Sequence, residues 1–319
     1  MTLIHSIKAS ASRLMRGAAG VALGLGFVGA LLSPCQALAQ AAAPAATPQA
    51  QGAGPALWVI RDPDSTIYLF GTVHVLRPTT GWGSAKVDTA FNAASEIYFE
   101  IENPADQAAV APLIQRYGVN PQGGLAHTLT AGQLTLLDSA ARSMGMTAVQ
   151  MDVFRPWLAG LTLSMAPLTK AGYDPNSGVE LVLRQRALAA GKPVKGLETL
   201  EQQIQFLATL PEPTQVAFLR STLESYEDAT TELDALVAAW AAGDVAAVQR
   251  LGVDEIRQQG GGLYRVLLTD RNTDWAGQIQ RMLAGSGTTF IAVGAAHLAG
   301  PDSVQAILQK RGVTVQTVN

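Results

Sequence analysis

Two short stretches near opposite ends of the chain repeat one pattern of strand, glycine and histidine. The first ends in Gly71-Thr72-Val73-His74 and the second in Gly294-Ala295-Ala296-His297. In each, an apolar run rich in β-forming residues predicts a buried strand, and the glycine permits a tight turn directly after it. A lone histidine in such a place is more often a satisfied polar residue than a ligand. Two of them at strand ends, where open α/β sheets bind ligands, predict an α/β fold with one shared site.

The N-terminal 39 residues have the composition of a secretory signal peptide. Lys8, Arg13 and Arg16 precede an apolar stretch over 17–32, and Ala37-Leu38-Ala39 provides an A-x-A cleavage site. The apolar stretch is too short for a comfortable membrane span. We therefore expect cleavage after residue 39 and an exported protein without a stable membrane anchor.

Composition limits what the exported chain can bind. Residues 40–54 are rich in Ala, Pro and Gln and predict a disordered linker before a folded part over 55–319. Cys35, the only cysteine, lies in the signal peptide, so His, Asp and Glu are the remaining metal ligands. Without the three signal-peptide cations, 19 of the 22 Lys and Arg stand against 25 Asp and Glu. This acidic balance, with no basic cluster, argues against a nucleic-acid partner.

The stretch over 96–102 places a carboxylate in an apolar strand. Alternation puts Ile97, Phe99 and Ile101 on one face and Glu100 on the other. A carboxylate between large apolar neighbours is costly unless it has a partner, which makes Glu100 a candidate site residue. The alternative is an edge strand with one face in water.

Two further glutamates lie close to predicted helix starts. Glu198 follows a short strand and points where ligands bind, although an acid in the first turn of a helix is also favoured by the helix dipole. Ser177 and Glu180 have the spacing of a capping box, which predicts a structural role for Glu180 at the start of a helix ending near residue 190.

The predicted helix near 263–283 carries an arginine in its core-facing stripe. Arg271 lies in register with apolar residues such as Leu268 and Trp275, and Asn272 follows it. A buried guanidinium needs an anionic partner, which could be a glutamate of the site, the C-terminal carboxylate or a substrate. Snorkelling of the side chain to the surface is the alternative.

Several segments, in their order and spacing, resemble the TraB/PrgY/GumN family. They are Leu57–Val59, Leu69–Leu76, Gly196–Thr199 with Gln202, Arg271-Asn272 with Trp275, and Val293–Asp302. With its signal peptide and linker, the chain looks most like the bacterial GumN branch. This family is similar to the Tiki metallopeptidases and, more distantly, to erythromycin esterase-like and ChaN-like proteins.

The resemblance implies an α/β fold with a mixed sheet and a large helical insert, here over about 104–285. It also implies one site made by His74, His297 and an acid on a core strand, which is Glu100 in this sequence. Glu198, Arg271 and Asn272 fit positions typical of the family.

These features together predict a periplasmic metal-dependent hydrolase similar to a metallopeptidase, acting on a peptide or other small substrate. His74, Glu100 and His297 would hold one divalent ion, for which Zn, Mn or Co suits two imidazoles and a carboxylate. Glu198 is the candidate general base, and Arg271 with Asn272 would stabilise the developing oxyanion.

Two alternatives remain open at the level of sequence. A His–Glu pair could activate water without a metal, as the likeness to erythromycin esterase-like proteins suggests. A non-enzymatic protein could instead sequester a peptide, a haem-like ligand or a polysaccharide, with an exposed Trp82 near the site as a stacking surface. The central helices are compatible with a lid or a homodimer interface.

Overall fold

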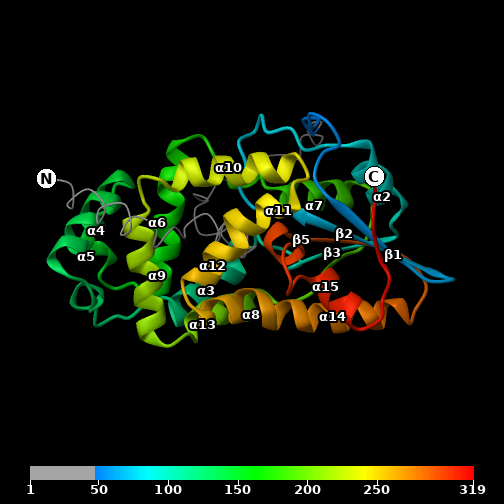
Figure 1. Cartoon of the computed structure of the whole chain (residues 1–319). Coiled ribbons are helices and arrows are strands. Elements are labelled where there is room, and N and C mark those ends of the chain that lie inside the picture. Colours follow the sequence, from blue (N-terminus) through cyan, green and yellow to red (C-terminus); the bar gives the residue numbers. More distant parts are fainter. Residues whose placement is uncertain (1–46) are drawn as a thin grey trace, which may run out of the picture.

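A mixed six-stranded sheet lies in one half of the molecule, with helices packed on both of its faces (Figure 1). The computed structural model describes residues 47–319, so the predicted signal peptide and the first part of the predicted linker lie outside it. The order across the sheet is β4-β3-β5-β2-β1-β6. The strands are β1 (Leu57–Arg61), β2 (Ser65–Thr72), β3 (Glu96–Phe99), β4 (Val194–Gly196), β5 (Gly287–Gly294) and β6 (Val315–Thr317). The predicted α/β fold with a mixed sheet is confirmed.

Four neighbouring strands run in the same direction and end at the same edge of the sheet. Strands β2 and β3 each pair in parallel with β5, and β4 pairs in parallel with β3. Opposite Thr72 in β2 lies Gly294 in β5, so the two Gly-x-x-His motifs leave the sheet side by side. Strand β1 forms a hairpin with β2 and is antiparallel to it, as β6 is to β1.

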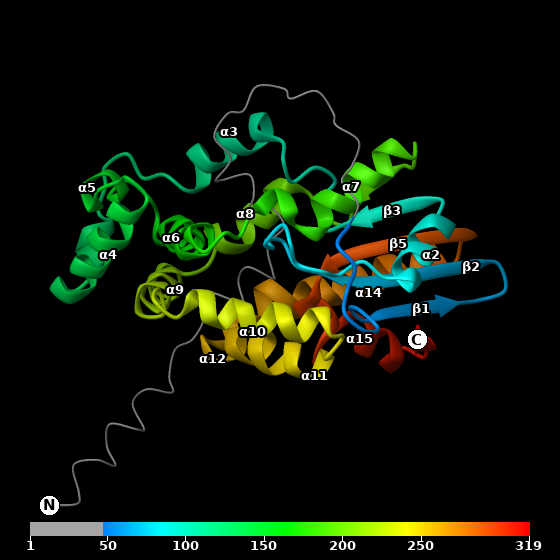
Figure 2. The ribbon, with the colours of Figure 1, turned by 90° about the horizontal axis from the view of Figure 1, so that it is seen from above.

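A large helical part is inserted between β3 and β5, as predicted. Before it, α2 (Ala85–Ala93) joins β2 to β3, and after it α15 (Val304–Lys310) leads to β6. The inserted helices are α3 (Gln107–Tyr117), α4 (Ala131–Ser143), α5 (Ala148–Met151), α6 (Pro156–Lys170), α7 (Val179–Ala189), α8 (Leu200–Ala208), α9 (Glu212–Glu224), α10 (Ala229–Ala241), α11 (Val245–Val248), α12 (Asp254–Gln258), α13 (Gly261–Tyr264) and α14 (Asp270–Leu283). Helices α4, α5, α6 and α9 lie far from the sheet, beyond the carboxyl ends of its strands (Figures 1 and 2).

Both faces of the sheet are buried, because alternate residues of its central strands enter two different hydrophobic clusters. In β2 and β5, Phe70 and Phe290 pack with residues of α2, α7, α8 and α10. Their neighbours Leu69 and Ile291 pack with residues of α14 and α15 on the other face. This double cover explains why the central strands read as continuous apolar runs.

The tryptophan expected at the surface is part of the core. Trp82 is 2% exposed, and its ring lies 6.2 Å from that of Phe70 and 6.5 Å from that of Trp240. Its backbone N–H donates to the carbonyl of Pro48, so the segment before β1 also fixes it. The prediction of an exposed Trp82 is therefore wrong.

The predicted position of Glu198 close to a helix start is confirmed, whereas the predicted capping role of Glu180 is not. Thr199 and Gln202 form a capping box before α8, which leaves Glu198 outside that helix, close to its start as predicted. The capping box predicted at Ser177 is wrong, because Ser177 ends a short 3-10 turn and Gly178 is the residue before α7.

Within residues 47–319 no helix combines the length and apolar character that a membrane crossing requires. The domain boundaries stay a prediction.

Candidate functional site

The carboxyl ends of the four parallel strands each supply one polar side chain to a common cluster. His74 follows β2, Glu100 follows β3, Glu198 follows β4 and His297 follows β5. All four side chains are at most 6% exposed. The parallel register of these strands thus places His74, Glu100 and His297 together, although they lie far apart in sequence.

Glu100 is the centre of the cluster. Its Oε1 accepts the backbone N–H of Gly294 at 2.8 Å and lies 3.8 Å from Nε2 of His74 and 3.7 Å from Nε2 of His297. Its Oε2 accepts from Nη2 of Arg271 at 2.7 Å. The edge-strand alternative for this carboxylate is wrong, because β3 lies between β4 and β5.

Glu180 binds the other side of His74. Nδ1 of His74 lies 2.7 Å from Oε1 of Glu180, and the Thr72 hydroxyl donates to the same oxygen. Burial has the largest single effect and would lower the pKa of His74, but the charge and hydrogen bond of Glu180 together with the charge of Glu100 outweigh it and raise that pKa above its usual value. Burial would likewise raise the pKa of Glu180, but His74 lowers it on balance.

Asn272 gives His297 the same kind of support. Nδ1 of His297 lies 2.5 Å from Oδ1 of Asn272, and Nδ2 of Asn272 donates to the backbone carbonyl of Asp302 at 2.8 Å. The ring of Trp275 contacts the imidazole, with a distance of 4.4 Å between the ring centroids and an angle of 44° between the ring planes. Because its amide nitrogen already donates to Asp302, Asn272 presents its oxygen to His297 and fixes the orientation of that ring.

Arg271 has the anionic partners that its buried position predicts. It is 2% exposed and binds both Glu100 and Glu198 through Nη2, while Nε donates to Glu198 Oε1 at 3.0 Å. Nη1 donates to the carbonyl of Leu267. The snorkelling alternative is wrong. Burial raises the pKa of Glu198 in spite of the guanidinium beside it.

Gln203 joins the two glutamates that share Arg271. Its Nε2 donates to Glu100 Oε2 at 2.8 Å and to Glu198 Oε1 at 3.0 Å. The contacts of Arg271 and Asn272 are thus made to residues of the cluster, which indicates that both position other side chains. Sequence reasoning missed Gln203 and Glu180, although Glu180 shares a helix face with the buried Leu183 and Ala187. That pattern is the one that identified Arg271.

The donor chemistry of the cluster fits a divalent metal. Both histidines have Nδ1 held by an oxygen acceptor, as metal-binding histidines usually do, and both direct Nε2 toward Glu100 Oε1. The spacings of 3.7 and 3.8 Å are too long for hydrogen bonds but suit atoms that share an ion at about 2.0–2.2 Å. No group of three or more His, Cys, Asp or Glu within residues 47–319 is arranged as a ready-made metal site. The metal assignment therefore stays a prediction.

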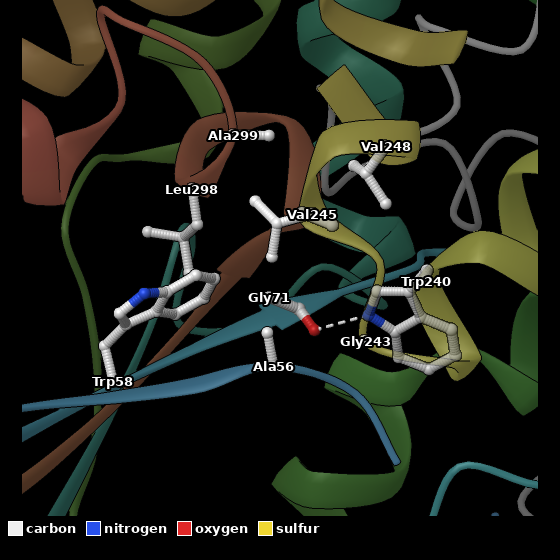
Figure 3. A pocket seen from close by; sticks show the side chains of 10 residues that line it. Ala56, Trp58, Gly71, Trp240, Gly243, Val245, Val248, Leu298 and Ala299 are labelled. Carbon is white, nitrogen blue, oxygen red and sulfur yellow. Dashed lines mark hydrogen bonds between the residues drawn. The ribbon is translucent and has the colours of Figure 1, made fainter. Parts of the chain in front are cut away.

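An apolar pocket lies beside the turn that carries His297 (Figure 3). Trp58, Val245, Val248 and Leu298 line it, and Trp240 donates a hydrogen bond from its indole to the carbonyl of Gly71. None of the histidines or glutamates of the cluster lines this pocket. The pocket and the cluster are therefore separate features.

Comparison with known proteins assigns this chain to one family. The model of the TraB/PrgY/gumN family matches residues 56–317, so the chain belongs to that family. An uncharacterized protein of Treponema pallidum (strain Nichols) is 26% identical over 294 residues, covering 88% of this chain and 87% of that protein. The uncharacterized protein YbaP of Escherichia coli (strain K12) is 27% identical over 185 residues, covering 58% and 68%. No solved structure matches the chain.

Proposed function

We propose that this family member is a periplasmic metal-dependent hydrolase, similar to a metallopeptidase, acting on a peptide or other small substrate. The observation that carries the proposal is the convergence of Nε2 of His74 and Nε2 of His297 on Oε1 of Glu100. Two imidazoles and one carboxylate are a common ligand set for Zn, Mn or Co.

The charge of the cluster supports a cation there. Three buried carboxylates, those of Glu100, Glu180 and Glu198, face one guanidinium, that of Arg271. With neutral imidazoles, two negative charges would remain uncompensated in a site of low dielectric, which is costly. The buried atoms Nε2 of His74 and Oε2 of Glu180 also have no hydrogen-bond partner among the described residues. A divalent cation at the three predicted ligands would offset this charge.

In the proposed mechanism, His74, Glu100 and His297 would hold the ion, whose Lewis acidity would make a water molecule more acidic and the scissile carbonyl more electrophilic. Glu198 accepts the proton of that water, because burial raises the pKa of its carboxyl toward the range useful for a general base. Arg271 holds Glu198 and Glu100 at fixed positions through its two ion pairs. Asn272 orients His297 through its side-chain oxygen, and the oxyanion contact expected of Arg271 with Asn272 stays a prediction.

Glu198→Gln separates proton transfer from metal binding. Because Gln keeps the shape of the side chain but cannot accept the proton, we expect peptide hydrolysis to fall by about 10²- to 10⁴-fold while bound metal is retained. The measurement is cleavage of a peptide library followed by mass spectrometry, with and without EDTA. Hydrolysis by the variant at the wild-type rate would exclude Glu198 as the base.

A metal-free hydrolase is the second candidate, and the contact between His74 and Glu180 is the observation that favours it. In that reading the carboxylate raises the basicity of the imidazole, which removes a proton from water directly. Hydrolysis that persists in EDTA would favour this reading over the metal-dependent one. The third reading, a protein that sequesters a ligand, relied on an exposed Trp82 as a stacking surface for that ligand. Trp82 is buried and cannot provide this surface.

A further inference from the structure

We propose that Glu180 is the positioning residue of His74, which it holds as the Nδ1–H tautomer so that Nε2 is presented to the ion. The consequence for metal binding rests on the proposed function, whereas the hydrogen bond itself does not. Glu180 comes from α7, a helix of the insert, and lies outside the strand ends that supply the other acidic residues of the cluster.

The hydrogen bond between Glu180 and His74 is buried and shares its acceptor oxygen with a second donor. Oε1 of Glu180 lies 2.7 Å from Nδ1 of His74 and also accepts the Thr72 hydroxyl, so two residues that are two apart in the chain contact the same carboxylate oxygen. The side chains of Glu180 and His74 are 8% and 4% exposed. Water therefore competes little for this hydrogen bond.

The backbone fixes α7 against the loop that carries His74. The N–H of Val179 donates to the carbonyl of Val73 at 3.0 Å. The backbone of Gly178 contacts the carbonyl group of His74 so closely that a Cβ at this position would lie 2.9 Å from the carbonyl carbon. Glu180 thus reaches the imidazole from a helix start that is itself attached to residues 73 and 74.

The carboxylate of Glu180 determines which tautomer of the His74 imidazole is present. An ionised carboxylate can only accept hydrogen bonds, so the nitrogen that contacts Glu180 must carry the proton. In a neutral imidazole the lone pair is then on Nε2, which faces Glu100. His297 has the same arrangement, but its acceptor is the neutral amide of Asn272. His74 is therefore held by an ionised acceptor and His297 by a neutral one.

The first test measures Zn²⁺ affinity of the full exported chain by competition with a chelating dye. We expect Glu180→Gln to weaken binding by about 10- to 100-fold, the usual effect of removing a carboxylate behind a metal-bound histidine. Glu201→Gln is the matched control, because Glu201 binds Tyr117 and Arg116 outside the cluster and should leave the affinity unchanged. Equal affinity in wild type and Glu180→Gln would overturn the proposal.

The second test needs no metal and separates this inference from the proposed function. Chelator-treated protein labelled with ¹⁵N-histidine is examined by NMR at alkaline pH, with His74→Gln used to assign the signals. We expect protonated Nδ1 and unprotonated Nε2 for His74 in the wild type, and loss of this preference in Glu180→Gln. A wild-type His74 protonated at Nε2 would overturn the inference. If the wild type bound no Zn²⁺ but showed the expected tautomer, only the proposed function would fail.

Discussion

Arg271→Met should lower the free energy of unfolding by about 3–5 kcal/mol, because it leaves two buried carboxylates without their cation. Arg271 pairs with both Glu100 and Glu198, and its own side chain is 1% exposed. Met fills much of the same volume, so the loss reports the charges rather than a cavity. Urea denaturation followed by circular dichroism measures the effect.

Arg116→Met is the matched control for Arg271→Met. Arg116 also pairs with a glutamate, Glu201, but its side chain is 70% exposed, and we expect a change below about 1 kcal/mol. Adding Glu198→Gln to Arg271→Met should recover part of the lost stability, because one unpaired buried charge is removed. A loss below about 1 kcal/mol for Arg271→Met alone would show that the carboxylates are not held as a buried ionised pair.

Gly178→Ala should both destabilise the fold and displace His74. A Cβ on residue 178 would collide with the backbone carbonyl of His74 and lie 3.0 Å from the carbonyl oxygen of Pro175. Backbone atoms cannot move aside as flexible side chains do, so we expect a loss of about 1–3 kcal/mol or more. Thermal unfolding measures the stability, and a Zn²⁺ titration reports the displaced histidine.

Gly132→Ala provides the control for that substitution. Gly132 lies in α4, and a Cβ there would have no neighbour within 4 Å. Alanine is favoured over glycine in a helix by about 1 kcal/mol, so this variant should be slightly more stable than the wild type. If Gly178→Ala behaved like Gly132→Ala, the close approach of α7 to the His74 loop would be wrong.

The central sheet was predictable because its signals are local. The apolar runs that end at Thr72 and Gly294 have strand composition, and their glycines mark where each strand ends. Thr199 and Gln202 have the spacing of a capping box, which places Glu198 before the helix that follows it. Each of these features depends on residues a few positions apart, which sequence patterns describe well.

The partners within the site were harder to predict, because they depend on which helices of the insert return to the sheet. Arg271 stood out as a charge in an apolar stripe, but its pairing with both Glu100 and Glu198 could not be read from spacing. A serine three residues before a glutamate at a helix start fits the capping-box motif, so the sequence predicts only a structural role for Glu180. The burial of Trp82 is hidden from the sequence for a related reason, because nothing local shows that Trp240 packs on it.

The metal content of the purified protein tests the central claim most directly. The chain from residue 40 onward would be purified without a histidine tag and analysed by plasma mass spectrometry, beside His74→Ala, His297→Ala and Glu100→Gln. The proposed function predicts about one equivalent of Zn, Mn or Co per chain in the wild type and its loss in each variant. Absence of bound metal from the wild type even after reconstitution, or full metal content in the histidine variants, would contradict it.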